Sequence, residues 1–447
     1  MASRHEPTRQ ARASSVSRIA YLNARLIDPA SGLDCPGALL IEDDAIADIG
    51  PALFSEGVPE GVETVDCGGR VLCPGLIDMR VFVGEPGSEH RETLASASQS
   101  AAAGGVTTFV TMPTTNPVID DVALVEYMAR RARDTAIVRA LPSAAVTKGI
   151  GGQRMTELGL LAEAGAVAFT DGDRAVADAQ VMRRCLSYAS AFDLLICQLP
   201  VEPALAGEGV MNEGEIAMRL GLPGIPTAAE TVMLDRDMRL VELTGGRYHA
   251  AAVSTAEGVE AIRRAKARGL EVTATALVHN FALNETAVGQ YRTFAKTTPP
   301  LRNEADRRAV VSGLADGTLD VIASGHDPQD VESKRLPFEQ AASGIVGLET
   351  LLPLALELYH NGDLSLLELI GKMTAGPARL LNLPHGRLAP GAPADLVIVE
   401  IDTPWQIDDE AFRSKSKNSP FGGRPVQGFV RRTVVGGKAV YARAAQA

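Results

Sequence analysis

The 447-residue chain has a mass of 47.0 kDa and contains 46% hydrophobic residues, enough to bury a large core in one large domain or in two to three average ones. It carries 43 Lys and Arg against 55 Asp and Glu, so its formal net charge of -12 has the wrong sign for neutralising phosphates or anionic lipid. No apolar stretch approaches the roughly 20 residues that span a bilayer. We therefore expect neither nucleic-acid nor membrane partners. The five cysteines, an odd number without a C-x-x-C pair, indicate reduced thiols and a cytoplasmic location.

Short β-type runs separated by turn residues predict a small β module built from both ends of the chain. Residues 1–17 contain three arginines but no apolar run of a secretory signal, which favours a disordered tail. Strands are expected in residues 18–73 and again in residues 386–447, and we expect these two segments to form one β-sandwich. The predicted strands are Tyr21–Ile27, Ala38–Ile41, Ala45–Ile49, Glu63–Asp66, Ala394–Val399, Gly428–Val435 and Lys438–Tyr441.

Residues 74–385 alternate apolar strand-like runs with amphipathic helical runs. Eight such strands predict an α/β fold of the (β/α)8 TIM-barrel type rather than an open sheet. In such a barrel the chemistry lies at the C-terminal ends of the strands. The predicted strands are Leu76–Val83, Thr107–Met112, Ile137–Ala145, Ala166–Thr170, Leu194–Leu199, Tyr248–Val253, Glu271–Leu277 and Leu319–Ser324. The predicted helices are Thr93–Ala103, Asp121–Arg133, Ala179–Ala191, Ala256–Arg268, Glu304–Ala315 and Val346–Tyr359.

Several short segments, in a fixed order from about Ile19 to Val440, carry a family resemblance. They are Pro74–Met79, Glu85–Gly87, Ala102–Thr108, Met112–Pro113, Thr115–Pro117, Met211–Gly214, Leu222–Pro226, Val253–Thr255, Pro299–Arg302, Gly344–Glu349 and Gly386–Ala389. Together they resemble the dihydroorotases of the amidohydrolase superfamily. The resemblance implies a metal-dependent barrel that reversibly cyclises carbamoyl aspartate to dihydroorotate in pyrimidine synthesis. Such a hydrolase needs imidazole and carboxylate ligands around one or two divalent ions, which lower the pKa of a bridging water.

The positions that hold these ligands in the family carry other residues here. Arg80 and Phe82 replace the first-strand His-x-His pair, and a guanidinium about 4 Å from a divalent ion would cost several kcal/mol. A bridging carboxylate, two further histidines and the acid/base aspartate align with Gly172, Leu199, Ala252 and Gly325. None of the seven histidines forms a His-x-His or a helical His-x-x-x-His pair, so a relocated zinc site is poorly supported.

Residues that contact the substrate in the family are also replaced. Thr114 and Thr298 stand where relatives carry asparagine, and Gln329 stands in place of a histidine. His249 is retained, and we interpret it as a structural core histidine. We therefore expect no catalytic, substrate-binding or metal residues and no cofactor.

These replacements predict a catalytically inactive dihydroorotase-like protein, a pseudoenzyme. The resemblance to certain bacterial systems implies a structural subunit that binds the catalytic chain of aspartate carbamoyltransferase, the preceding enzyme of the pathway. An obligate interface of that kind buries about 2,000 Å² or more. The expected assembly is a hetero-oligomer or a homo-oligomer.

Two alternatives stay open. The first is an amidohydrolase, a cyclic amide hydrolase with an altered or metal-free active site, because a carboxylate and a histidine can exchange protons without a metal. Its candidate groups near the barrel mouth are Asp171, Asp173, His279, His326 and Asp327. Against it, Asp-Gly-Asp and His-Asp-Pro are ordinary turn compositions, and Asn280 stands where relatives carry a second histidine. The second alternative is a free-standing protein that binds a small molecule.

Overall fold

The two ends of the chain meet in one eight-stranded sheet. The computed structural model describes residues 17–444, so the predicted tail lies outside the described residues apart from Ser17. The strands of the sheet are β1 (Arg18–Asp28), β2 (Leu33–Glu42), β3 (Ala45–Gly50), β4 (Glu63–Asp66), β5 (Val71–Pro74), β15 (Leu396–Gln406), β16 (Pro425–Val435) and β17 (Lys438–Ala442). Their order is β17-β16-β15-β5-β1-β2-β3, and β4 pairs with β1. Strand β5 joins the two ends because it pairs parallel with β1 and antiparallel with β15.

Both ends also supply the apolar core of this sheet. Leu26 and Leu39 from the first segment pack in one buried cluster with Leu396 and Val434 from the last segment. Leu72, on β5, belongs to the same cluster. Burial of this shared face ties each segment to the other, since neither has a complete core alone.

A second set of strands is entirely parallel. These strands are β6 (Leu76–Val81), β7 (Val106–Thr111), β8 (Arg139–Pro142), β9 (Leu195–Gln198), β12 (Arg247–Ala250), β13 (Val272–Leu277) and β14 (Val321–Ala323). They pair as β6-β7-β8 and as β9-β12-β13-β14. Phe169 forms parallel bridges to Ala144 and Ile196, and Val81 forms one to His326, so the pairings lead from β6 around to β14 and back to β6. The predicted strand 166–170 is thus reduced to the bridging residue Phe169.

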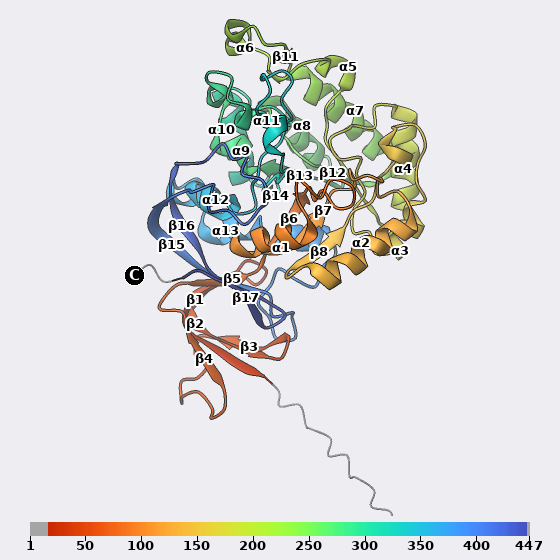
Figure 1. Cartoon of the computed structure of the whole chain (residues 1–447). Helices are drawn as coiled ribbons and strands as arrows, with labels where there is room; N and C mark the ends of the chain where they lie inside the picture. Colours follow the sequence, from red (N-terminus) through yellow and green to blue (C-terminus); the bar gives the residue numbers. More distant parts are fainter. Residues whose placement is uncertain (1–16, 445–447) are drawn as a thin grey trace, which may run out of the picture.

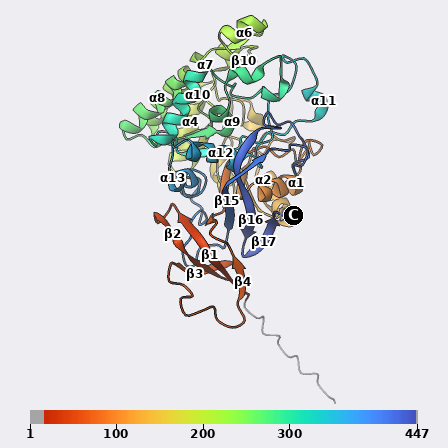
Figure 2. The same cartoon turned by 90° about the vertical axis from the view of Figure 1, so that its left-hand side faces the viewer.

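Helices separate most of these strands along the chain. They are α1 (Leu94–Ala103), α2 (Val122–Thr135), α3 (Leu158–Glu163), α4 (Ala179–Ser190), α5 (Pro203–Ala206), α6 (Glu215–Leu220), α7 (Ala228–Thr244), α8 (Ala256–Ala267), α9 (Val278–Ala282), α10 (Glu304–Ala315), α11 (Val331–Lys334), α12 (Leu351–His360), α13 (Leu366–Gly371) and α14 (Ala375–Leu380). Short 3₁₀ turns lie at Lys148–Ile150, Glu285–Val288 and Thr293–Ala295, and a two-stranded ribbon is formed by β10 (Met211–Asn212) and β11 (Gly224–Ile225). Figures 1 and 2 show strands β1–β4 at one end of the molecule and helix α6 at the other.

Polar caps explain where several helices begin. The Thr93 side chain accepts a hydrogen bond from the Ser96 backbone, and Thr255 and Asn303 cap α8 and α10 in the same way. Helix α10 has the predicted bounds, and α1, α2, α4 and α8 lie within two residues of theirs.

Two expectations about the helices were wrong. The helix predicted from Val346 begins only at Leu351. The segment before it is held by contacts outside the helix, because the Val346 N–H donates to the Asn418 carbonyl and the Gly347 N–H donates to the His326 ring. The seventeen-residue helix α7 was not predicted at all. Its buried face includes the carboxylates Glu230 and Asp237, which interrupt the apolar periodicity on which helix prediction depends.

Within residues 17–444, every helix is too short or too polar to cross a lipid bilayer.

Candidate active site

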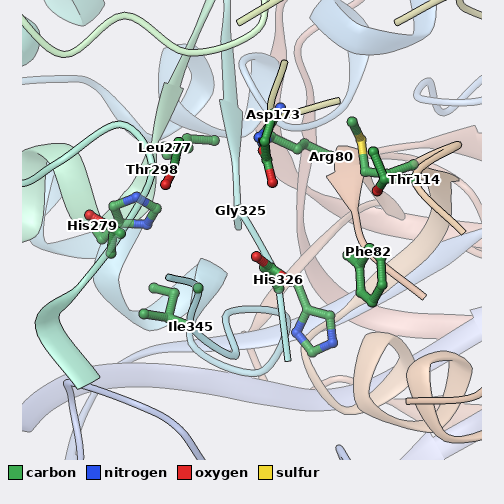
Figure 3. A pocket seen from close by; sticks show the side chains of 14 residues that line it. Arg80, Phe82, Thr114, Asp173, Leu277, His279, Thr298, Gly325, His326 and Ile345 are labelled. Carbon is green, nitrogen blue, oxygen red and sulfur yellow. The ribbon is translucent and has the colours of Figure 1, made fainter. Parts of the chain in front are cut away.

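A small cavity with a volume of about 30 Å³ lies at the carboxyl ends of the parallel strands. Its lining combines charged, polar and apolar side chains from segments far apart in sequence (Figure 3). The lining residues are Arg80, Phe82, Met112, Thr114, Asp173, Leu277, His279, Thr297, Thr298, Gly325, His326, Asp327, Gly344 and Ile345. This is the end of the strands at which the chemistry was expected from the sequence.

Arg80, on β6, brings a positive charge into the cavity. Its Nη2 donates to Asp173 Oδ1, and Figure 3 shows the two side chains in contact. The Arg80 side chain is only 11% exposed, whereas the Asp173 side chain is 52% exposed. The second terminal nitrogen, Nη1, is buried and has no hydrogen-bond partner in the protein. Buried polar atoms are normally satisfied, so Nη1 marks a place for an acceptor from a ligand or a water.

Asp327 supplies the best-placed proton acceptor. Its Oδ1 accepts hydrogen bonds from Arg91 Nη2 at 2.7 Å and from Gln329 Nε2 at 3.0 Å. Burial and the nearby Asp173 raise the pKa of Asp327 to about 6, although Arg91, Arg80 and Lys334 act in the opposite direction. A carboxyl with a pKa near neutrality is suited to general acid/base work.

Gly344 leaves the approach to the Asp327 carboxylate open. It has a φ of +124°, and a Cβ atom at this position would lie 2.6 Å from Asp327 Oδ2. A larger residue would therefore displace the carboxylate from the cavity.

His279, at the start of α9, offers a neutral imidazole. Burial lowers its pKa to about 3, and the positive charge of Arg80 adds to this effect. Both of its ring nitrogens are buried without a protein partner, as are both side-chain polar atoms of the neighbouring Asn280. At neutral pH the ring thus presents one N–H donor and one acceptor.

Not every candidate from the sequence takes part in the cavity. Asp171 lies outside its lining and accepts hydrogen bonds from the backbone and hydroxyl of Thr147. His249 lies inside the protein, where its two nitrogens contact Thr273 and Thr275 hydroxyls at 2.8 and 2.7 Å. Burial lowers the His249 pKa to about 3, which keeps this ring neutral.

His326 lines the cavity but directs its ring toward the protein. Its Nδ1 accepts the Gly347 N–H at 3.1 Å, and its Nε2 lies 3.5 Å from Glu92 Oε2. Glu92 also accepts hydrogen bonds from Ser96 and Ser414. Burial alone would raise the Glu92 pKa, but His326 and these hydroxyls lower it overall. This pair therefore anchors the loop after β14 to the start of α1.

The donor set does not fit the divalent metal that the resemblance implies. Leu199 and Ala252, at two former ligand positions, pack with Leu277 and Ala323 in a buried apolar cluster. A Cβ atom on Gly325 would lie 3.0 Å from His279 Cε1, so an aspartate there needs the ring to move. Across residues 17–444, no three His, Cys, Asp or Glu side chains are grouped so that they could hold a metal ion.

Two charged groups around Asp327 were not anticipated. Arg91 bonds Asp327 and lies over the Phe82 ring, 4.1 Å from its centroid. Its position in the loop after the first parallel strand was the available signal, since such loops build the sites of these folds. Lys334 donates to the backbone oxygens of Thr293 and Ala342, and burial lowers its pKa to about 7. No sequence pattern pointed to it.

Several segments that carry the family resemblance meet beside the cavity in one buried network around Arg302. Arg302 Nη1 donates to Asn212 Oδ1 at 2.9 Å and to the Ile225 carbonyl at 2.8 Å, and its Nε donates to Ser254 Oγ at 3.2 Å. Ser254 in turn donates to Glu230, and Asn212 donates to Glu285 Oε2 at 2.8 Å. The network fixes the β10–β11 ribbon to the loops after β12 and before α10.

The comparisons with known proteins agree over almost the whole chain. A family model described as Dihydro-orotase-like matches residues 69–258, and one described as Amidohydrolase family matches residues 345–441. The dihydroorotase of Wolbachia sp. subsp. Brugia malayi is 47% identical over 95% of this chain and 96% of its own length. The dihydroorotase of Anaplasma phagocytophilum is 46% identical over 95% of each chain.

Solved structures with the same fold are named hydantoinases and dihydropyrimidinases. L-hydantoinase (dihydropyrimidinase) from Arthrobacter aurescens superposes with a TM-score of 0.85 at 25% identity and covers 96% of both chains. Dihydropyrimidinase from Brevibacillus agri NCHU1002 gives a TM-score of 0.81 at 21% identity, with 95% of both chains covered. The fold is therefore an α/β fold of the amidohydrolase type.

These comparisons contradict the prediction that the chain is a catalytically inactive protein and not an enzyme. Relatives that share 46–47% of its residues over their full length are named dihydroorotases, and its structural neighbours are named hydantoinases. They support instead the alternative of an amidohydrolase with an altered site. The prediction gave most weight to the lost metal ligands, whereas the fold gathers several candidate groups of that alternative, Asp173, His279, His326 and Asp327, in one cavity.

Proposed function

The chain belongs to the dihydroorotase family, and from this premise we propose that it is an amidohydrolase that opens and closes cyclic amides at an altered, metal-free site. Dihydroorotate is the first candidate substrate, which would place the enzyme in pyrimidine biosynthesis. The observation that carries the proposal is the convergence of Asp327, His279 and Arg80 on one cavity.

The proposed reaction needs one proton acceptor and one group that polarises the carbonyl. Asp327 takes a proton from water, and the resulting hydroxide oxygen bonds to the amide carbonyl carbon. The neutral His279 ring donates a hydrogen bond to the carbonyl oxygen as negative charge develops there. The ring C–N bond then breaks, and the proton held by Asp327 passes to the departing nitrogen. Cyclisation is the same sequence in reverse.

Turnover of dihydroorotate before and after chelation tests this function. We expect ring opening and closure by the purified full-length chain to survive dialysis against a chelator. After loading with excess zinc and desalting, the protein should retain far less than one ion per chain. Absence of turnover in both directions would contradict the proposed function. Activity that disappears with the chelator and returns with zinc would contradict only its metal-free character.

We also propose the finer arrangement of the fold. The parallel strands form a (β/α)8 barrel over residues 74–385, and residues 18–73 and 386–444 form the two parts of a β-sandwich. The return of the parallel pairings to β6 supports the barrel, and the sheet shared by both chain ends supports the common module.

The association with the catalytic chain of aspartate carbamoyltransferase stays a prediction, as does a cytoplasmic location. The association does not depend on whether this chain turns over a substrate. Co-expression of both chains from one organism, followed by native mass measurement, is expected to give a stable mixed assembly. Two separate species at micromolar concentration would contradict it.

A further inference from the structure

We propose that the Arg80 guanidinium is a binding site for a carboxylate group of the ligand, and that Asp173 occupies this site until the ligand replaces it. The inference depends on the proposed function only for the identity of the natural ligand. Anion binding at Arg80 can be measured without turnover.

Arg80 has the geometry of a carboxylate receptor. The guanidinium plane offers parallel N–H donors that match the two oxygens of a carboxylate. Nη2 is engaged by Asp173, whereas Nη1 is buried and has no protein partner. The Arg80 backbone N–H donates to Asp78 Oδ1 at 3.0 Å, which holds this part of β6 in place. A ligand carboxylate in place of Asp173 could satisfy both nitrogens, which Asp173 does not do.

Asp173 is the partner that can leave. Its side chain is 52% exposed, but the Arg80 side chain is 11% exposed. The loop is anchored two residues earlier, where Asp171 accepts the Thr147 backbone N–H at 2.9 Å. Ion pairs with one exposed partner contribute little to stability, so rotation of Asp173 into solvent is a small energetic step.

The charges around Arg80 favour an anion once Asp173 has moved. The other carboxylate of the cavity, Asp327, is already paired with Arg91 at 2.7 Å. His279 is neutral, because burial holds its pKa at about 3. The three threonines of the lining, Thr114, Thr297 and Thr298, are uncharged. Arg80 would then be an uncompensated, largely buried cation, and a charge in that setting requires a counter-ion.

Calorimetric titration with malonate, a small dicarboxylate, tests the inference at low ionic strength. We expect the full-length protein to bind it and Arg80→Met to lose that binding. Asp173→Asn removes the competing carboxylate and should tighten binding by roughly two- to fivefold. Arg174→Met, in the same loop but outside the cavity lining, is the matched control and should bind like the unaltered protein.

Each outcome bears on one claim. Unchanged affinity for malonate in a folded Arg80→Met variant overturns the anion site. If the Met variant does not fold, the same titration is made with Arg80→Lys, which keeps the charge. Unchanged or weaker affinity in Asp173→Asn overturns the displacement of Asp173. Malonate binding that depends on Arg80, in a protein without turnover of dihydroorotate, leaves this inference standing and rejects the proposed function alone.

Discussion

Replacing Asp327 by asparagine is expected to lower turnover of dihydroorotate by about 10²- to 10⁴-fold, the usual contribution of a positioned proton-transfer group. The amide has nearly the same shape as the carboxylate and can still accept a hydrogen bond from Arg91 Nη2, which lies 2.7 Å from Asp327 Oδ1. The amide cannot take a proton from water. Steady-state rates of ring opening and closure measure the effect.

The matched control is Asp330→Asn, three residues further along. Asp330 caps α11 by accepting the Ser333 N–H at 2.8 Å, and asparagine caps a helix equally well. This variant should retain the activity of the unaltered protein. Equal activity of Asp327→Asn and Asp330→Asn would rule out Asp327 as the proton acceptor.

The pH dependence of kcat/KM is an independent test of Asp327 as the proton acceptor. Burial and Asp173 raise the pKa of Asp327 to about 6, so the fraction of ionised carboxylate increases as pH rises through this value. A general base works in its ionised form, and kcat/KM should therefore increase with pH and level off above about 6. Arg91, Arg80 and Lys334 also face this carboxylate and limit the upward shift. Asp327→Asn should remove this limb of the profile.

Replacing Arg302 by methionine is expected to lower the free energy of unfolding by about 3–5 kcal/mol, the usual cost of leaving a buried charge network without one of its partners. Arg302 is 3% exposed, and the carboxylates Glu230, Asp306 and Glu285 all act on its charge. Burial lowers the pKa of Arg302, against the attraction of these groups. Chemical denaturation of both proteins measures the difference.

Arg308→Met provides the surface control on the neighbouring helix. Arg308 is 75% exposed and pairs with Glu304 within α10, an interaction that contributes little in water. A loss for Arg302→Met no larger than that for Arg308→Met would show that the network does not depend on its guanidinium. If the methionine variant does not accumulate, Arg302→Lys keeps the charge and should show a smaller loss.

Local patterns predicted much of the secondary structure because many elements here obey simple rules. Helix α10 begins after the Asn303 cap, and β4 has the bounds expected from its short β-type run between turn residues. Helix α7 escaped prediction because Glu230 and Asp237 lie on its buried face. Glu230 accepts the Ser254 backbone N–H, and Asp237 accepts hydrogen bonds from Tyr248 and from the adjacent Arg236. Apolar periodicity cannot identify buried carboxylates that are satisfied by such contacts.

The candidate site was predictable only in part, for a similar reason. The sequence named Asp173, His279 and Asp327 among its alternatives, and the fold brings all three to one cavity. It also grouped Asp171 with them, although that carboxylate is bound by Thr147 outside the lining. The pairing of Asp327 with Arg91 joins residues 236 positions apart, and no local motif encodes such a contact.

The shared sheet also sets an order of assembly during synthesis. Cys73 on β5 lies opposite Val397 on β15, although 324 positions separate them in the chain. The parallel strands pair mostly with near neighbours in sequence, so they can associate while the ribosome is still translating. Until β15 emerges, one edge of β5 has no partner, and an open strand edge invites pairing with other chains. A nascent chain that stalls before β15 would therefore expose the unpaired edge of β5, through which it could pair with other chains. The last fifty or so residues cover this edge, so they protect against aggregation in addition to completing the fold.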